Sequence, residues 1–250
     1  MNATLVTSGA PRGEPVPTAY RSTARTHVGR VRKVNEDRIL DRPDRALWAV
    51  ADGMGGHRGG DIAAELVVAA LRDLADDPAP ITDDAIRAAL MRANDAILGR
   101  SAAAGGVIGS TIVALHIAHG EAHLFWAGDS RAYRATRGAW EQMTRDHSLV
   151  QELLDQGLID ARDAAHHPRA HVITRALGVD ATVEVESLSF PIAEDETILL
   201  CSDGLSRSLD PAALRDSGNR EADALLADAL RKDGSDNISF LVIRSNESAT

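Results

Sequence analysis

Cysteine and long hydrophobic runs are nearly absent from this sequence. Cys201 is the only cysteine among 250 residues, so no disulfide can form within the chain, as is typical of proteins from reducing compartments. No apolar run approaches the roughly 20 residues that a membrane span requires. The first 17 residues lack the charged-then-apolar order of a signal peptide. We therefore predict a cytoplasmic protein that does not enter a membrane.

Basic residues are also fewer than acidic ones. The chain has 27 Lys and Arg residues against 37 Asp and Glu residues, which gives a formal net charge of -10. A surface with this balance repels nucleic acid and anionic membranes. We therefore expect neither nucleic acid nor a membrane surface as a partner.

Domain linkers and repeats are missing as well. Between Thr18 and Ser245 no stretch rich in Pro, Gly or Ser is long enough to separate two domains, and no segment repeats at a fixed period. A chain of this length with 44% hydrophobic residues can bury one substantial core. We predict one domain over residues 21–245, with a flexible leader (1–20) and a short tail (246–250).

The hydrophobic pattern predicts a mixture of strands and helices. Short apolar runs bounded by Gly, Asp or Asn predict strands at 47–51, 111–118, 121–127, 131–135, 197–201 and 238–243. Apolar residues at helical spacing predict helices at 61–75, 83–98 and 221–230. Short turns between successive strands favour antiparallel hairpins, so we predict an α+β fold with helices on the outer faces of antiparallel sheets.

Residues 144–178 follow no single period. Helical stretches are expected at 148–156 and 161–166, followed by irregular chain. Insertions of this kind often form a lid or flap beside a functional site.

Acidic residues recur in turns beside the predicted strands. The clusters are Asn35-Glu36-Asp37, Asp52-Gly53, Gly128-Asp129-Ser130, Ser202-Asp203-Gly204 and Ser235-Asp236-Asn237. An aspartate followed by glycine at a strand end leaves a carboxylate and a backbone carbonyl free for a hard cation. Magnesium or manganese suits such oxygens better than zinc, because no His-x-x-x-His pair lies on a predicted helix. These dipeptides are also ordinary turn formers, so a metal site and simple turns both remain open at this point.

Longer motifs decide between these two interpretations. They are Arg32-x-x-Asn35-Glu36-Asp37, Ala51-Asp52-Gly53-Met54-Gly55-Gly56-His57, Gly109-Ser110-Thr111, Gly128-Asp129-Ser130-Arg131, Thr144-Arg145-Asp146-His147-Ser148, Ile173-Thr174-Arg175-Ala176-Leu177-Gly178, Cys201-Ser202-Asp203-Gly204-Leu205 and Asp236-Asn237-Ile238-Ser239. Together, and in this order, they resemble the bacterial branch of the PPM, or type-2C, protein phosphatases. The similarity runs from about Arg21 to Arg244.

The resemblance implies a fold, an activity and partners. The fold is a four-layer αββα sandwich, in which two antiparallel sheets are flanked by helices. The activity is metal-dependent hydrolysis of phosphoserine and phosphothreonine on proteins, with two or three Mn²⁺ or Mg²⁺ ions as cofactors. The substrates would be those of a bacterial serine/threonine kinase, and the enzyme would be a monomer.

The resemblance also implies metal ligands, position by position. Asp52 would bridge two metal ions, and the carbonyl of Gly53 would bind one of them. Asp203 and Asp236 would bind the other ion. Asp129 matches a position that, with Asp203, holds a third and weaker cation in bacterial relatives.

Three further residues match positions around these metals. Glu36 and Asp37 would hold the surrounding water, and Arg32 matches the arginine that binds phosphate. A water that bridges two cations is acidified enough to attack phosphorus in line, without a covalent enzyme intermediate. The planar guanidinium of Arg32 can donate to two phosphate oxygens and stabilise their charge. Arg32 and Asp37 are therefore the candidate catalytic residues, and Glu36 belongs to the metal site.

Two positions depart from family patterns. Met54 stands where eukaryotic relatives carry a histidine, as it does in bacterial members, so the proton donor to the leaving group is unassigned. His57 is an alternative donor, although a histidine in a Gly-rich turn is more often structural or solvated. His171 stands where we expect asparagine, which leaves the substrate preference of residues 144–178 open.

Two other functions compete with this interpretation. Cys201 and Arg207 fit the C-x-x-G-x-x-R pattern of cysteine-dependent phosphatases, in which a thiolate attacks phosphorus. Cys201 ends an apolar run, however, so we interpret it as a core residue. The second alternative is a catalytically silent binding or sensing module, which the full set of acidic residues disfavours.

The remaining aromatic and histidine side chains receive structural roles. Trp48 and Trp126 lie in predicted strands and should pack in the core. His116, His119 and His123 lack metal-like partners in the sequence, so we expect them to face solvent.

Overall fold

The computed structural model describes residues 19–55, 59–104, 106–137, 139–165, 167–193, 195–209 and 222–246. Its strands are β1 (Tyr20–His27), β2 (Asp37–Arg42), β3 (Leu47–Met54), β4 (Gly109–Ser110), β5 (Ile112–Ala118), β6 (Glu121–Ala127), β7 (Arg131–Thr136), β8 (Ala139–Gln142), β9 (Glu186–Pro191), β10 (Thr197–Cys201) and β11 (Ile238–Ser245). Its helices are α1 (Gly60–Asp76), α2 (Asp83–Ala104), α3 (Leu149–Asp155), α4 (Ala161–Ala165), α5 (Asp203–Ser206) and α7 (Ala222–Lys232).

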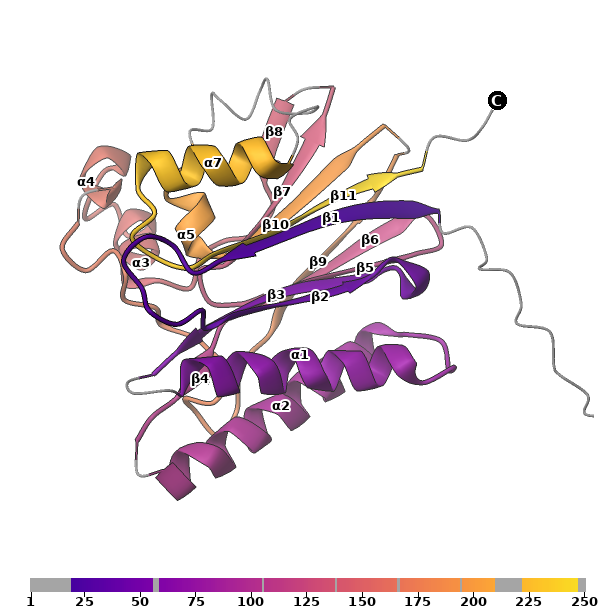
Figure 1. Cartoon of the computed structure of the whole chain (residues 1–250), viewed down its shortest axis with the longest axis horizontal. Coiled ribbons are helices and arrows are strands. Elements are labelled where there is room, and N and C mark those ends of the chain that lie inside the picture. The colour runs from indigo at the N-terminus through magenta and orange to yellow at the C-terminus, as the bar shows by residue number, and fades with distance from the viewer. Residues whose placement is uncertain are drawn as a thin grey trace, which may run out of the picture.

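The strands form two antiparallel sheets. One is five-stranded in the order β1-β11-β10-β7-β8, and the other is six-stranded in the order β2-β3-β5-β6-β9, with β4 pairing with β3. Figure 1 shows α7 and α5 over the first sheet and α1 and α2 over the second. The layers are therefore helix, sheet, sheet and helix, which confirms the predicted αββα sandwich.

Three buried clusters hold these layers together. The central cluster, which includes Trp48, Leu115 and Leu241, lies between the two sheets. A second cluster packs α1 and α2 against the six-stranded sheet, and a third packs α5 and α7 against the five-stranded sheet. Trp48 and Trp126 are 0% and 5% exposed, which confirms their predicted place in the core.

Every predicted strand and long helix is present, but five strands were missed, among them the two-residue β4. The segments now seen as β1, β2, β8 and β9 carry many polar residues and no apolar run. All four lie at sheet edges, and β1 alternates between half-buried and exposed residues over much of its length. Backbone pairing with an apolar neighbour, rather than an apolar pattern of their own, explains these strands.

The solvent-facing assignment of His116 was wrong. His116 is 6% exposed, because it shares a face of β5 with Ile112 and Ala114, and that face packs against the helices. Burial, and secondarily His123, lowers the pKa of His116 to about 4. The ring is therefore neutral, whereas His119 is exposed as predicted and His123 is half-buried.

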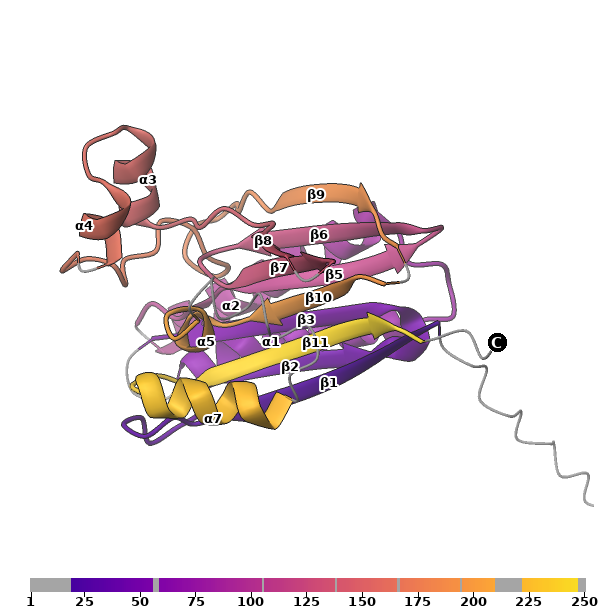
Figure 2. The same cartoon turned by 90° about the horizontal axis from the view of Figure 1, so that it is seen from above.

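The segment 144–178 projects from one end of the sandwich. It carries α3 and α4 close to their predicted positions, and Figure 2 shows both helices standing away from the sheets. None of the helices in the described ranges combines the length and apolarity needed to cross a bilayer.

Candidate active site

A cleft of about 710 Å³ lies at the end of the sandwich from which α3 and α4 project. It is lined by Arg32, Glu36, Asp52, Gly53, Met54, Gly55, Thr111, Asp129, His171, Ile173, Asp203, Arg207, Ser235, Asp236 and Asn237. All of the predicted site residues except Asp37 therefore line one cavity. His171 and Ile173 come from segment 144–178, which confirms that this segment lies beside the site.

Strand register explains why acidic residues far apart in sequence meet here. Asp37 begins β2 and pairs with Asp52 near the end of β3. In the other sheet, Cys201 at the end of β10 pairs with Phe240 near the start of β11. Because neighbouring strands are antiparallel, these starts and ends fall at the same edge of each sheet. The residues that precede or follow them therefore enter one cleft.

Asp52 and Gly53 form the floor of the cleft. The backbone of Asp52 exchanges hydrogen bonds with Thr111, which donates its N–H to the Asp52 carbonyl at 2.8 Å and accepts from the Asp52 N–H through Oγ1 at 3.1 Å. A Cβ on Gly53 would lie 2.0 Å from the carbonyl oxygen of Gly60. Only glycine therefore allows α1 to begin this close to β3.

Glu36 and Asp37 differ in their exposure to the cleft. Glu36 lines it, and its carboxylate accepts a hydrogen bond from the backbone of Gly60 at the start of α1, where the helix dipole favours an anion. Asp37 is 2% exposed and lies behind the cleft wall. The Ser202 hydroxyl donates to Asp37 Oδ2 at 2.9 Å.

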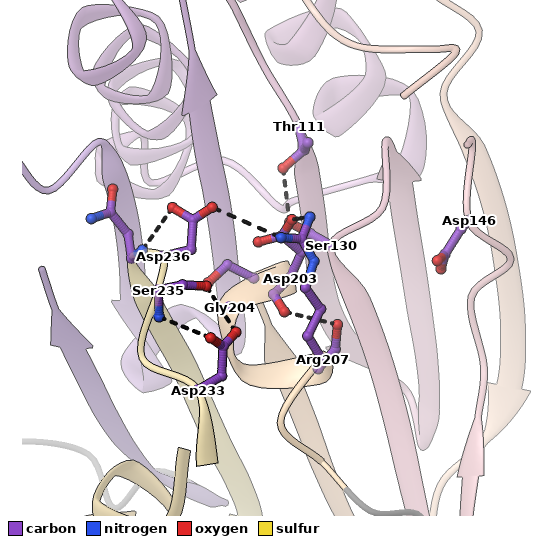
Figure 3. Close-up of polar contacts among 12 residues, drawn as sticks. Thr111, Ser130, Asp146, Asp203, Gly204, Arg207, Asp233, Ser235 and Asp236 are labelled. Atoms are coloured by element: carbon purple, nitrogen blue, oxygen red, sulfur yellow. Dashed lines mark hydrogen bonds and ion pairs between the residues drawn. The ribbon is translucent and has the colours of Figure 1, made fainter. Parts of the chain in front are cut away.

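Asp203 and Asp236 lie near the guanidinium group of Arg207, as Figure 3 shows. Arg207 forms an ion pair with Asp203 one helical turn earlier, and its Nη1 lies 4.0 Å from Asp236 Oδ2. Arg32 Nη2 donates to Asp236 Oδ2 at 2.8 Å. Two guanidinium groups therefore neutralise part of the acidic charge.

Asp129 occupies the turn between β6 and β7. Gly128 before it has φ +115°, a conformation that favours glycine, and a Cβ there would lie 2.6 Å from the Thr111 side chain. The Thr111 and Ser130 hydroxyls are 2.8 Å apart and hydrogen-bonded (Figure 3). His147 Nδ1 accepts from the Gly128 N–H at 3.1 Å, which joins this turn to the start of segment 144–178.

The carboxylates strongly perturb one another's ionisation. Burial raises the pKa of Asp52 well above its usual value, and Asp37 and Asp203 raise it further. Burial raises the pKa of Asp129 to about 7, with a further contribution from Asp203. Burial likewise raises the pKa of Asp37 to about 7, although hydrogen bonds from Ser239 and Ser202 oppose the shift. The site therefore resists ionisation unless cations are added.

The donor atoms suit divalent cations. Within the described part of the chain, Asp37 Oδ1 and Asp203 Oδ1 are buried without a hydrogen-bond partner. Crowded carboxylates with spare oxygens and a nearby backbone carbonyl are the ligands that Mg²⁺ and Mn²⁺ prefer. Among those same residues, no three acidic, histidine or cysteine side chains already form a metal-binding group. Arg207 and Arg32 engage Asp203 and Asp236 instead, so a cation must compete with them.

Sequence reasoning missed the supporting role of Asn237. Its Nδ2 donates to the carbonyls of Val28 and Val34 at 2.9 and 3.0 Å, and its Oδ1 accepts from the Glu36 N–H at 2.8 Å. One side chain therefore fixes both ends of the loop that carries Arg32. The position of Asn237 beside Asp236 was the only available signal. His57, the alternative proton donor, lies outside the described residues.

Cys201 does not have the properties of a nucleophile. It is fully buried, and burial raises the pKa of its thiol to about 12. A low-pKa thiolate is required for attack on phosphorus. Cys201 is therefore a core residue, as the apolar run before it predicted.

Comparison with known proteins agrees with the fold and the cleft. The family Protein phosphatase 2C matches residues 26–235. The serine/threonine phosphatase stp of Listeria welshimeri is 36% identical over 238 residues, which cover 89% of this chain and 94% of that protein.

Solved structures show the same likeness. PppA of Pseudomonas aeruginosa has a TM-score of 0.82 and 39% identity, with 91% of this chain and 98% of that chain covered. The catalytic domain of the phosphatase PstP, in complex with two manganese ions, has a TM-score of 0.81 and 35% identity, with 90% and 97% covered.

A carboxylate-lined cleft at one end of an αββα sandwich, with arginines beside the carboxylates, is the arrangement of a metal-dependent phosphatase. The chain belongs to the protein phosphatase 2C family. It is a serine/threonine protein phosphatase that depends on divalent metal ions and acts on phosphoproteins.

Proposed function

We propose that Asp52, Gly53, Asp203 and Asp236 hold two divalent cations, with Asp52 and the Gly53 carbonyl on one side and Asp203 and Asp236 on the other. The convergence of these residues from strand ends in both sheets is the observation that carries this proposal. The manganese in the PstP structure favours Mn²⁺ for both positions. When bound, the cations supply the nucleophile by acidifying a water and stabilise charge on the phosphoryl oxygens.

A third, weaker cation would be shared by Asp129 and Asp203. Burial raises the pKa of both carboxylates, and the charge of Asp203 raises the pKa of Asp129 further. Asp129 lies in the turn between β6 and β7, whereas Asp52 lies in β3. The different origin of the two carboxylates fits an additional ion at Asp129.

Arg32 is the proposed phosphate-binding residue. Its side chain is 52% exposed at the cleft and donates one of its N–H groups to Asp236. The remaining donors of its planar fork are free to approach two phosphate oxygens. Glu36 and Asp37 would orient water around the cations, Asp37 from behind the cleft wall.

The remaining features of the biological setting are proposals of the same kind. The catalytic domain would span residues 21–245, act in the cytoplasm as a monomer and remove phosphates added by a serine/threonine kinase. Bacterial relatives named as serine/threonine phosphatases support substrates that are phosphorylated on serine or threonine.

Hydrolysis of a phosphothreonine peptide tests the proposed mechanism. Wild type, Asp203→Asn and Cys201→Ser would be assayed with Mn²⁺ and again with excess EDTA. We expect activity that requires Mn²⁺, is lost in Asp203→Asn and survives in Cys201→Ser. EDTA-resistant activity that is lost in Cys201→Ser would overturn the metal mechanism, and folded wild type without activity would point to a binding module.

A further inference from the structure

Arg207 has no part in the proposed catalytic mechanism, although it lies inside the cleft. It follows α5, one helical turn after Asp203, and forms an ion pair with that residue. Its Nη1 lies 4.0 Å from Asp236 Oδ2. With Cys201 buried and unreactive, the thiolate mechanism no longer accounts for an arginine at this position.

The charge of Arg207 reaches the proposed third-cation position. Burial raises the pKa of Asp203 and of Asp129, and the charges of Arg207 and Arg131 oppose the rise at both residues. Arg131 forms its ion pair with Asp146, whereas Arg207 is paired with Asp203 itself and lines the same cleft as Asp129. Arg32 differs, because its ion pair is with Asp236.

One oxygen of Asp203 cannot bind both the Arg207 guanidinium and a cation at full strength. Asp203 has two oxygens, of which Oδ2 binds Arg207 and Oδ1 is buried without a hydrogen-bond partner among the described residues. A cation on Oδ1 can coexist with Arg207, but a second cation on Oδ2 must displace the guanidinium. Two positive groups at one carboxylate also repel each other.

We propose that the Arg207 guanidinium is a built-in competitor for the cation shared by Asp129 and Asp203, and that it sets the weak affinity of that ion. The inference rests on the ligand set proposed above. With cation absent, Arg207 compensates the charge of Asp203 and stabilises the cleft. An excess of cation displaces the Arg207 guanidinium from Asp203 Oδ2.

Mn²⁺ titration by calorimetry of the full chain tests this inference. Arg207→Met removes the charge without adding an oxygen ligand, and Arg207→Lys keeps the charge but loses the planar fork. Arg231→Met is the matched control, because Arg231 forms a similar exposed helical ion pair with Asp228 on α7. Thermal unfolding in EDTA gives a second reading that does not depend on catalysis.

We expect Arg207→Met to bind its weakest Mn²⁺ about tenfold more tightly than wild type, since a charge-assisted hydrogen bond is comparable with the free energy of a tenfold change. Arg207→Lys should fall between the two, and Arg231→Met should match wild type. In EDTA at neutral pH, Arg207→Met should unfold at a lower temperature, because Asp203 loses its counter-charge.

Equal or weaker Mn²⁺ binding by Arg207→Met would overturn the competitor role while leaving the ligand set intact. If Arg207→Met does not fold, Arg207→Lys decides, with tighter binding than wild type in support and equal binding against. Wild type that binds no Mn²⁺ at all would instead refute the ligand set, and the competitor role with it.

Discussion

Burial makes each aspartate of the cleft costly to ionise. Asp52, Asp129 and Asp37 all have raised pKa values, with burial as the largest cause in each. In an enzyme that binds cations this cost is offset by the metal, so the side chains that weaken the metal-free protein are those we propose to bind the ions or to orient water around them. At these positions the carboxylates needed for function therefore lower the stability of the metal-free protein.

Asp129→Asn should stabilise the metal-free protein at neutral pH. Because the pKa of Asp129 is raised to about 7, the folded wild type holds a proton that the unfolded chain has already lost, and its stability falls as pH rises from about 4 to about 7. Asn carries no charge, so we expect a shallower fall and a gain of about 1–3 kcal/mol at pH 8. Urea unfolding in EDTA across this pH range measures the difference.

The control for Asp129→Asn is the same titration with saturating Mn²⁺, where the order should reverse as the variant loses a ligand. Equal pH profiles for the two proteins in EDTA would show that Asp129 ionises normally.

Arg32→Lys should impair catalysis with little effect on folding. Lysine keeps the charge but cannot donate to two phosphate oxygens in one plane, so we expect kcat/KM to fall roughly tenfold to a hundredfold. Steady-state hydrolysis of a phosphothreonine peptide measures the change. Arg30→Lys, from the same loop, is the control, because Arg30 contacts the carbonyl of Leu230 rather than lining the cleft. An unchanged kcat/KM for Arg32→Lys would remove Arg32 from phosphate recognition.

Close backbone approaches hold the elements of the site in register. A Cβ on Gly204 would lie 2.0 Å from the carbonyl oxygen of Asn237, so α5 and the start of β11 touch only because glycine is present. This contact places Asp203 beside Asp236. A packed backbone carbonyl cannot move aside as a flexible side chain can.

Gly204→Ala should therefore destabilise the protein by about 1–3 kcal/mol through overpacking. It should also weaken Mn²⁺ binding, because α5 and β11 must separate. Urea unfolding and calorimetry measure the two effects. Gly99→Ala is the matched control: Gly99 lies in α2, and no atom of the described part of the chain is within 4 Å of the added Cβ, so this change should stabilise by about 0.5–1 kcal/mol. Equal effects of the two substitutions would contradict the close approach.

The elements differed in how well the sequence predicted them. Strands such as β5, β6 and β10 were predictable because their own residues are apolar and buried. β1 and β9 were not, because they depend on the neighbours with which they pair, and pairing is a property of the assembled sheet. The burial of His116 was missed for the same reason, since a single strand does not show which face a helix covers.

At the scale of the whole molecule, antiparallel pairing turns sequence-distant aspartates into one site. Asp37 and Asp52 meet across β2 and β3, while Asp203 and Asp236 enter from β10 and β11 in the other sheet. Motif order suggested the members of the site from the sequence. The distances between them, the place of Asp37 behind the cleft wall and the ion pairs of Arg32 and Arg207 with the aspartates are visible only in the packed sheets.

X-ray diffraction from crystals grown with Mn²⁺, recorded at the manganese absorption edge, tests the central claim most directly. We predict anomalous peaks in the cleft at Asp52, Asp203 and Asp236, with a weaker peak between Asp129 and Asp203, and Arg207 turned away from Asp203 wherever that peak is present. Peaks elsewhere on the protein, or a cleft with no manganese and both arginines still paired with Asp203 and Asp236, would contradict this account.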